Sequence, residues 1–443
     1  MMKKLTIKCI LPLVAALAFA ACDTDVEHDI PQVNAPVFVS SVPADGATDV
    51  KHGSTTITVK YDKNVFFATS NLSAITLTGD GGTIVGANVY GSNTDLVIDV
   101  RLERGKTYSI NIPEGVVLGP NKMPAAAVNL QFATANIVPS LVNASATAVT
   151  QKVYNYLVEA YGGKMLSGAM ANVNWNTEEA DRVHTLTGKY PAINTFDYVH
   201  LPFSPANWID YSDISPVKNW WTAGGLVSIM WHWNVPAEEG SDEYAFYKEE
   251  TTFDAANATA SGTWENEVFT ADLAKVATSL KQLQSENIAV IWRPFHEAAG
   301  GWFWWGKDAD SQKELWVAMF DYFKAEGVNN LIWVWTTETG DADWYPGDSY
   351  VDIIGRDLYD KDAATAAGQY QTIDDVYSTK LIGLTECGTV GLISEQWTAG
   401  ARWSWFMPWY DNANAETPHA SDAWWTDAMS QSFVVTRDQL PGF

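Results

Sequence analysis

The chain is poor in cysteine and in basic residues, and each shortage excludes a class of protein. Cysteine occupies 3 of 443 positions, so a disulfide framework is excluded and stability must come from burial of a core. Lysine and arginine number 27 against 53 aspartates and glutamates, which gives a formal net charge of −26. Such a surface repels nucleic acid and anionic lipid headgroups. We therefore expect a neutral ligand, and the 21 tryptophans, 18 tyrosines and 17 phenylalanines suit the apolar faces of sugar rings.

Several catalytic signatures are missing as well. No G-x-S-x-G elbow of a serine hydrolase occurs, and no Gly-rich phosphate turn follows the first strand predicted after residue 145. His296 and Glu297 could begin the zinc-protease motif H-E-x-x-H, which would need a second histidine at position 300. The chain has Gly300 there, so no zinc site is expected. Cys387 is interpreted as a small buried hydrophobe rather than a nucleophile. Nothing in the sequence demands a metal or an organic cofactor.

The start of the chain predicts secretion. Lys3, Lys4 and Lys8 precede an apolar run from Ile10 to Ala21, a pattern typical of a cleaved signal peptide over residues 1–21. The run is shorter than the roughly 20 residues that a membrane-spanning helix needs. No other segment of the sequence is a candidate for crossing a membrane.

The junction at residues 20–22, Ala-Ala-Cys, resembles the lipobox of bacterial lipoproteins. Phe19 departs from the usual aliphatic residue. The resemblance implies that Cys22 carries the lipid, followed by a tether over residues 22–35. The acidic residues after it resemble tags that send some lipoproteins of Gram-negative bacteria to the outer surface: Asp23, Asp25, Glu27 and Asp29. We expect an outer-membrane, cell-surface monomer, with ordinary secretion as the alternative.

Residues 36–136 alternate between apolar and polar side chains in short runs separated by turns, for example TTITVKYD, TDLVIDV and YSINI. Period-two alternation without a helical pattern predicts a β-sandwich. The stretch SVPADGATDV at residues 41–50 resembles the opening of bacterial immunoglobulin-like domains. That resemblance implies a spacer, and a sugar-binding module is the alternative.

From residue 145 to 443 apolar strands alternate with helical patterns, which predicts parallel strands with helical crossovers. The eight strand candidates are residues 164–170, 192–198, 226–233, 289–297, 331–338, 351–359, 381–388 and 403–409. Eight such units most economically make a (β/α)8 barrel, and a doubly wound sheet is the alternative. Between the fourth and fifth strands, Ser311 to Glu314 is a capping-box signature for a helix.

The active site of such a barrel lies at the C-terminal ends of its strands. The residues that close the predicted strands are His232, His296, Glu297, Glu338, Asp357, Tyr359, Glu386 and Trp409. Glycoside hydrolysis needs one protonated and one ionised carboxyl group. Glu297 and Glu386, on strands four and seven at opposite sides of one barrel mouth, satisfy that requirement. The alternative is that they are structural ion-pair partners.

The region from 145 to 443 resembles glycoside hydrolase family 26, which is dominated by β-mannanases. The motifs that carry the resemblance are RPFHEAAGGWFWWG (293–306), TECG (385–388), YPGDSYVDIIGRDLY (345–359) and MWHW (230–233). It implies that Glu297 is the acid/base and Glu386 the nucleophile of a retaining enzyme, with carboxyl groups about 5 to 5.5 Å apart. The chain departs from the family pattern after each glutamate. Cys387 follows Glu386, where the family more often carries an aromatic residue. In HEAAGG, Ala-Ala-Gly follows Glu297, where Met-Asn-Gly is common.

The same resemblance places five residues around the cleaved sugar: His232, His296, Trp302, Tyr359 and Trp409. Trp403 and Trp405 are alternatives to Trp409. Tyr359 is expected to donate to Glu386. Arg293 and Asp357 are expected to hold the glutamates and tune their pKa values.

The activity that this resemblance implies is endo-β-1,4-mannanase action on galactomannan or glucomannan. The same machinery acting on β-1,3-xylan or mixed-linkage β-glucan stays open, as does exo rather than endo action. From a different class, a non-catalytic surface glycan-binding protein is the alternative. The segment 234–270 is long for a βα loop and is predicted to shape one end of the cleft.

Overall fold

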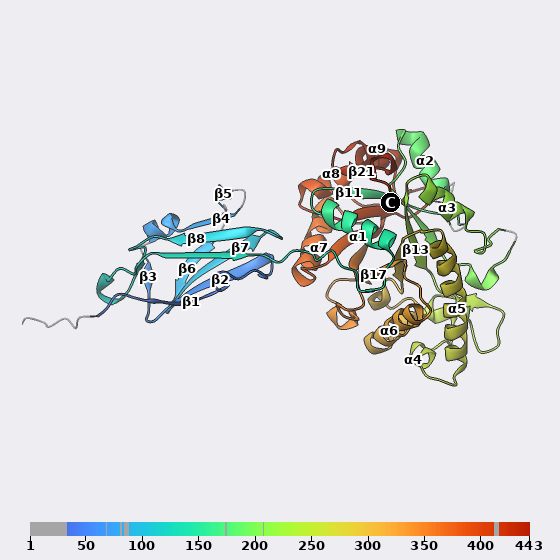
Figure 1. The fold of residues 1–443 in the computed structure, drawn as a ribbon, viewed down its shortest axis with the longest axis horizontal. Coiled ribbons are helices and arrows are strands. Elements are labelled where there is room, and N and C mark those ends of the chain that lie inside the picture. Colours follow the sequence, from blue (N-terminus) through green and yellow to red (C-terminus); the bar gives the residue numbers. More distant parts are fainter. Residues whose placement is uncertain are drawn as a thin grey trace, which may run out of the picture.

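The computed structural model describes residues 33–67, 69–79, 82–83, 88–172, 175–206, 208–411 and 416–443. They form a β-sandwich and a larger barrel (Figure 1). The predicted signal peptide, Cys22 and most of the predicted tether lie outside the described residues. Within the described ranges, no helix combines the length and apolarity needed to cross a membrane.

The sandwich has two antiparallel sheets. One sheet has the order β1 (Phe38–Val42), β2 (Gly53–Tyr61), β7 (Asp95–Leu102), β6 (Asn88–Ser92), and the other has the order β10 (Val128–Ala133), β8 (Thr107–Ile112), β4 (Thr76–Gly79), β5 (Gly82–Thr83). A small pair, β3 (Phe66–Phe67) and β9 (Val117–Leu118), lies beside them. On β2, alternate residues Ile57, Val59 and Tyr61 are buried, which is the period-two pattern of a strand with one face on the core. The all-β prediction is confirmed.

The barrel consists of eight parallel strands. They are β11 (Met165–Met170), β12 (Ile193–Asp197), β13 (Leu226–Trp231), β16 (Val290–Pro294), β17 (Leu331–Thr337), β18 (Ile353–Tyr359), β19 (Leu381–Gly388) and β20 (Trp405–Pro408). Since β11 pairs with both β12 and β20, the sheet closes on itself. A short strand, β21 (Val434–Val435), adds to β11 from outside the ring. The predicted (β/α)8 barrel is confirmed, and the doubly wound alternative is wrong.

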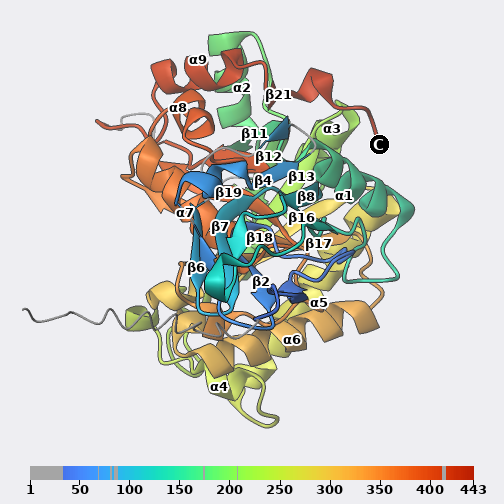
Figure 2. The same cartoon turned by 90° about the vertical axis from the view of Figure 1, so that its left-hand side faces the viewer.

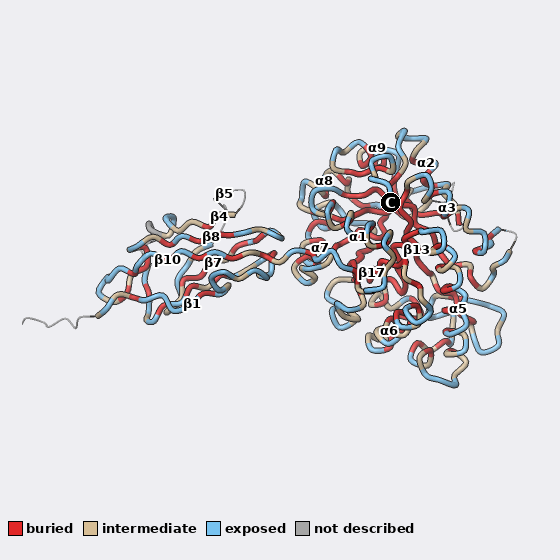
Figure 3. The backbone as a smooth tube through the Cα atoms, in the orientation of Figure 1, coloured by how far each residue is buried: buried red, intermediate tan, exposed pale blue. Residues whose placement is uncertain are grey.

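Helices surround the strands, which are buried on both faces (Figure 3). They are α1 (Ala148–Ala160), α2 (Glu178–Thr187), α3 (Ser215–Thr222), α4 (Ala255–Ala258), α5 (Trp264–Ser285), α6 (Ala309–Ala325), α7 (Ala363–Val376), α8 (Ile393–Thr398) and α9 (Asp422–Ser430). The capping box predicted at Ser311 is wrong. Helix α6 begins earlier because the Asp308 carboxylate accepts a hydrogen bond from the Ser311 amide at 2.9 Å, which makes Asp308 the N-cap.

The sandwich contacts the barrel beside α7 (Figure 1), and Figure 2 views the molecule from the sandwich side. Asp374, in the last turn of α7, accepts from Arg104 at 2.7 Å and lies 3.0 Å from His52 Nε2. Asp374 precedes the start of β19 at Leu381, so this joint lies at the N-terminal ends of the barrel strands. The C-terminal ends, which carry the predicted site, face the other way.

Candidate active site

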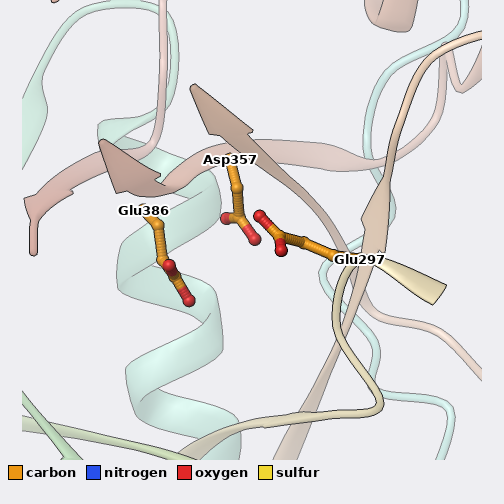
Figure 4. Close-up of side chains that lie close together, drawn as sticks. All are labelled: Glu297, Asp357 and Glu386. Atoms are coloured by element: carbon orange, nitrogen blue, oxygen red, sulfur yellow. The ribbon is translucent and has the colours of Figure 1, made fainter. Parts of the chain in front are cut away.

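The barrel brings the two predicted glutamates together. Glu386 lies near the end of β19, and Glu297 follows the end of β16. Carboxylate oxygens of Glu297, Glu386 and Asp357 all lie within 4.8 Å of one another. Figure 4 shows Glu297 and Asp357 pointing toward one another, with Glu386 beside them. The closure of the barrel therefore creates a compact cluster of three acids.

The backbone leaving β16 is bent in an uncommon way. Phe295 and Glu297 have φ angles of 49° and 52°, in the left-handed region that non-glycine residues seldom adopt. Such conformations cost about 1–3 kcal/mol each and persist where the surrounding structure enforces them, often at functional sites. This bend sets the position from which Glu297 reaches Asp357 and Glu386.

A buried arginine lies at the centre of the cluster. Arg293, on β16, donates to Asp357 Oδ2 at 2.9 Å and also to Glu386 Oε1. Asp357 is fixed in turn by the Thr385 hydroxyl, which donates to its other oxygen at 2.6 Å. Arg293 therefore holds Glu386 in place, and Asp357 holds Arg293.

Glu386 is stabilised as a carboxylate by two donors. The hydroxyl of Tyr359 donates to Glu386 Oε2 at 2.9 Å, while Arg293 donates to the other oxygen. Burial raises the pKa of Glu386, and the Arg293 charge and hydrogen bond oppose that rise. Burial also raises the pKa of Tyr359, with help from neighbouring carboxylates, so its hydroxyl keeps the proton that it donates.

Glu297 has no cationic partner in direct contact among the described residues. Burial, together with the charges of Asp357, Glu386 and Glu338, raises the pKa of Glu297 from 4.5 to about 10. Its carboxyl oxygen accepts a hydrogen bond from the indole of Trp302 at 3.1 Å. At neutral pH the proton shared by the pair therefore sits on Glu297 and the negative charge on Glu386.

Two histidines and an aspartate extend the network. Asp197, at the end of β12, lies 2.6 Å from His232 Nδ1, and His232 Nε2 lies 3.1 Å from His296 Nε2. Burial lowers the pKa of His296 well below its usual value, so His296 is neutral. If His232 donates from Nδ1 to Asp197, its Nε2 accepts from His296. Sequence reasoning missed Asp197, although it too is a polar residue closing a predicted strand.

The tryptophans divide between cleft and core. In the segment GWFWW, Trp302 is 41 % exposed, whereas Phe303, Trp304 and Trp305 are buried. The ring of Trp409 lies 5.5 Å from that of His232. The two alternatives to Trp409, Trp403 and Trp405, are buried in the core. The structure therefore places Trp302 and Trp409 at the site.

Within the described ranges, the carboxylate oxygens of Glu297, Asp357 and Glu386 are close enough together to hold a metal ion. However, Arg293 already donates to two of them. A carboxylic acid is a poor metal ligand, and the raised pKa keeps Glu297 protonated. The arrangement therefore suits proton transfer. Cys387 is buried, which raises the pKa of its thiol, as expected for a structural cysteine.

The segment 234–270 packs against one side of the site. It contains the strands β14 (Val235–Pro236) and β15 (Tyr244–Ala245) and the short helix α4, and α5 begins at Trp264, so the connection is shorter than predicted. The amide of Lys248 donates to the Trp302 carbonyl at 2.9 Å, and the amide of Trp304 donates to the Phe246 carbonyl at 3.0 Å. The loop thus braces the backbone that carries Trp302.

Two families match this chain. Residues 142–439 match glycosyl hydrolase family 26, and residues 32–134 match a bacterial Ig-like domain. Among curated proteins, the chain is 34 % identical to mannan endo-1,4-beta-mannosidase B of Piromyces sp, over 73 % of this chain and 57 % of that protein. It is 36 % identical to mannan endo-1,4-beta-mannosidase of Thermothelomyces thermophilus, over 69 % and 64 %. The chain therefore spans less than two thirds of the length of these relatives.

Solved structures give the same likeness. A family 26 domain from an endo-beta-mannanase/endo-beta-glucanase of Prevotella bryantii is 44 % identical, covers 69 % of this chain and 100 % of that chain, and has a TM-score of 0.66. A beta-mannanase from a symbiotic protist of the termite Reticulitermes speratus, complexed with gluco-manno-oligosaccharide, is 38 % identical over 70 % of this chain and 99 % of that chain, with a TM-score of 0.62.

Proposed function

The chain belongs to glycosyl hydrolase family 26, and we propose that it is a retaining endo-β-1,4-mannanase that hydrolyses galactomannan or glucomannan. The observation that carries this proposal is that two adjacent acids are held in different protonation states. Glu297 keeps its proton because its pKa is raised to about 10, and Glu386 is held by Arg293 and Tyr359. The mannanase names of the relatives support the choice of polymer.

The carboxyl separation supports retention. Oxygens of Glu297 and Glu386 lie within 4.8 Å, close to the separation of about 5–5.5 Å in retaining enzymes and shorter than the roughly 6.5–9.5 Å of inverting ones. Glu386 attacks the anomeric carbon while Glu297 protonates the departing glycosidic oxygen. This yields a covalent glycosyl-enzyme intermediate, which water then hydrolyses.

The cluster also explains how Glu297 changes role between the two steps. Part of its raised pKa comes from the negative charge of Glu386. Once Glu386 is esterified that charge is gone, so the pKa of Glu297 falls and its carboxylate accepts the proton of the attacking water. His232, His296, Tyr359, Trp302 and Trp409 line the same mouth, and we assign them to binding the sugar at the cleavage point.

The first experiment measures new reducing ends after the soluble chain, without residues 1–22, is incubated with galactomannan, glucomannan, β-1,3-xylan and mixed-linkage β-glucan. We expect release from the mannans, and loss of it by orders of magnitude in Glu386→Ala. Release from another polymer would replace the substrate and keep the mechanism. Binding without release from any polymer would favour a non-catalytic glycan-binding protein.

Chemical rescue tests the roles of the two glutamates. In Glu386→Ala, added azide is expected to attack the anomeric carbon directly and give a glycosyl azide of inverted configuration. In Glu297→Ala, azide should attack the covalent intermediate and give the retained β-azide, with the fastest rates for substrates with good leaving groups. The reverse pattern would exchange the two assignments.

We also propose that the chain is a lipid-anchored monomer on the surface of a Gram-negative bacterium, with its sandwich as a spacer. The joint at His52, Arg104 and Asp374 is on the barrel face opposite Glu386, so an anchor at Cys22 would leave the cleft facing outward. Cys22→Ser should move the protein from the membrane fraction to the soluble fraction. Digestion of intact cells with a protease should remove the anchored form, and protection from it would contradict surface exposure.

A further inference from the structure

Three aromatic side chains on the catalytic face of the barrel are unusually exposed. Phe203 is 42 % exposed, Trp208 is 46 % exposed and Tyr244 is 37 % exposed, whereas most large aromatic residues of the barrel are buried. They touch one another: the ring centroid of Phe203 lies 6.4 Å from that of Trp208 and 5.7 Å from that of Tyr244. We call Phe203, Trp208 and Tyr244 the aromatic platform. Contiguous exposed apolar surface of this kind marks binding sites more often than chance exposure does.

The backbone that carries the platform is braced. Phe203 ends the 3-10 turn η3 (Leu201–Phe203), which follows β12, and the side-chain amide Nδ2 of Asn234 donates to the Val199 carbonyl at 2.7 Å just before that turn. Ala206 and Ile209 form a β-bridge around Trp208. Tyr244 belongs to β15, which pairs with β14. Rings held by such contacts lose little conformational freedom on binding, which favours affinity.

The platform continues the surface of the catalytic centre. The segments that carry it follow β12 and β13, whose ends provide Asp197 and His232. Phe246, two residues beyond Tyr244, has its ring 5.2 Å from that of His232, and Tyr247 stacks on Phe303 at 5.7 Å. The segment that carries Tyr244 therefore also contacts the catalytic centre through Phe246.

We propose that Phe203, Trp208 and Tyr244 form an outer subsite that stacks on a sugar ring of the same polymer, beyond the units at the cleavage point. This proposal rests on the proposed glycan hydrolase function. Flat aromatic faces suit the apolar faces of neutral sugar rings, and the three rings carry no charge that would select an ionic ligand. The occupant is a neutral β-linked hexose unit because the segment that carries Tyr244 also reaches His232, in the cleft that would hold the rest of the polymer.

Chain length provides the test. We expect Trp208→Ala and Tyr244→Ala to lower the ratio of kcat/KM for mannohexaose to kcat/KM for mannotriose about 3- to 10-fold each, the range expected for one lost aromatic contact. The matched control is Tyr90→Ala on strand β6 of the sandwich, because Tyr90 is 41 % exposed and far from the cleft. Thermal unfolding of each variant verifies that it is folded.

A second measurement separates this subsite from turnover. In the Glu386→Ala background, calorimetry with mannohexaose should show Kd raised about 3- to 10-fold by Trp208→Ala. Unchanged affinity, or an equal effect on mannotriose and mannohexaose, would overturn the subsite. If the wild type cleaves a different polymer, oligosaccharides of that polymer replace the manno-oligosaccharides. If it neither cleaves nor binds any of the four polymers, the proposed function is wrong, and the subsite proposal, which rests on it, is wrong as well.

Discussion

At the catalytic face, Glu297, Asp357 and Glu386 lie together, and Arg293 pairs with Asp357 and Glu386 but not with Glu297. At the opposite face, the carboxylate of Asp374 lies against Arg104 and His52 of the sandwich, with Arg101 at 3.7 Å. Both clusters are largely buried, yet the pKa values of their acids are shifted in opposite directions. Burial and like charges raise the pKa of Glu297 to about 10. Burial alone would raise the pKa of Asp374 as well, but His52 and Arg104 outweigh it and lower that pKa.

The difference lies in the ratio of acids to cations. A carboxylate surrounded by donors strengthens the folded state, since its ionised form is satisfied. An acid kept neutral beside other acids weakens the folded state, because it must take up a proton that the unfolded chain would release at neutral pH. The joint is therefore built for stability, and the catalytic cluster gives up stability in exchange for a proton donor.

The largest expected effect comes from removing the catalytic proton. Glu297→Gln should lower kcat on polymer about 10²- to 10⁴-fold, the usual contribution of a general acid. The same variant should raise the free energy of unfolding by about 2 kcal/mol near pH 7, because the uncharged amide needs no proton. Reducing-sugar assays and thermal unfolding measure the two effects. A fall in both activity and stability would contradict the comparison.

The pH dependence of the stability difference between Glu297→Gln and the wild type follows from the direction of the pKa shift of Glu297. Since the folded pKa of Glu297 lies above its ordinary value of 4.5, its contribution to stability is fully present below that value and is lost as pH rises towards about 10. The stability advantage of Glu297→Gln should therefore grow between pH 5 and pH 9. Denaturant unfolding at several pH values measures it.

The next effect concerns Tyr359, the hydroxyl donor to Glu386. Tyr359→Phe removes the hydrogen bond to Glu386 Oε2, and hydrogen bonds to charged groups contribute about 1.5–3 kcal/mol. We expect kcat to fall about 10- to 100-fold. Losing the donor also raises the pKa of Glu386, so the acidic limb of the pH–rate profile should move to higher pH. An unshifted acidic limb would show that Tyr359 acts on the sugar rather than on Glu386.

At the joint, the same acid-to-amide change should act with the opposite sign. Asp374→Asn removes a charge held by Arg104 and His52 and is expected to cost about 1–3 kcal/mol, with kcat unchanged. The depressed pKa of Asp374 means that its contribution is present at neutral pH and lost as pH falls through the folded pKa. The matched control is Asp375→Asn, whose pair with Arg101 is more exposed and should cost under about 1 kcal/mol. Calorimetric unfolding at pH 7 and at several pH values below 3.8 measures both variants.

The smallest effect tests the like-charge contribution alone. Glu338 pairs with Arg356 at 2.7 Å, and its charge helps to raise the pKa of Glu297. Glu338→Gln removes that charge and leaves Arg356 uncompensated, and both changes lower the pKa of Glu297. The alkaline limb of kcat/KM should therefore move to lower pH. An unmoved limb would leave burial and the other two acids as the cause of the shift.

The strand ends were predictable because their signal is local. Apolar runs closed by a polar residue located Glu297, Glu386, Asp357 and Tyr359, and the barrel places such ends at one mouth. Asp197 carries the same signal and was missed. The three rings of the aromatic platform carry no pattern that separates them from buried aromatics, since Trp305 is as apolar as Trp208 and lies in the core.

The sequence by itself determined the two-part architecture, the order of the barrel strands and the position of Glu297 and Glu386 at strand ends, because side-chain periodicity and strand-end chemistry depend on neighbouring residues. Only the tertiary structure decided which acid keeps the proton. That choice depends on Arg293 reaching Glu386 rather than Glu297, on burial, and on the approach of Asp357. The joint between Asp374, Arg104 and His52 arises in the same way. Electrostatic energies depend on distance and burial, and both are set only when distant parts of the chain fold together.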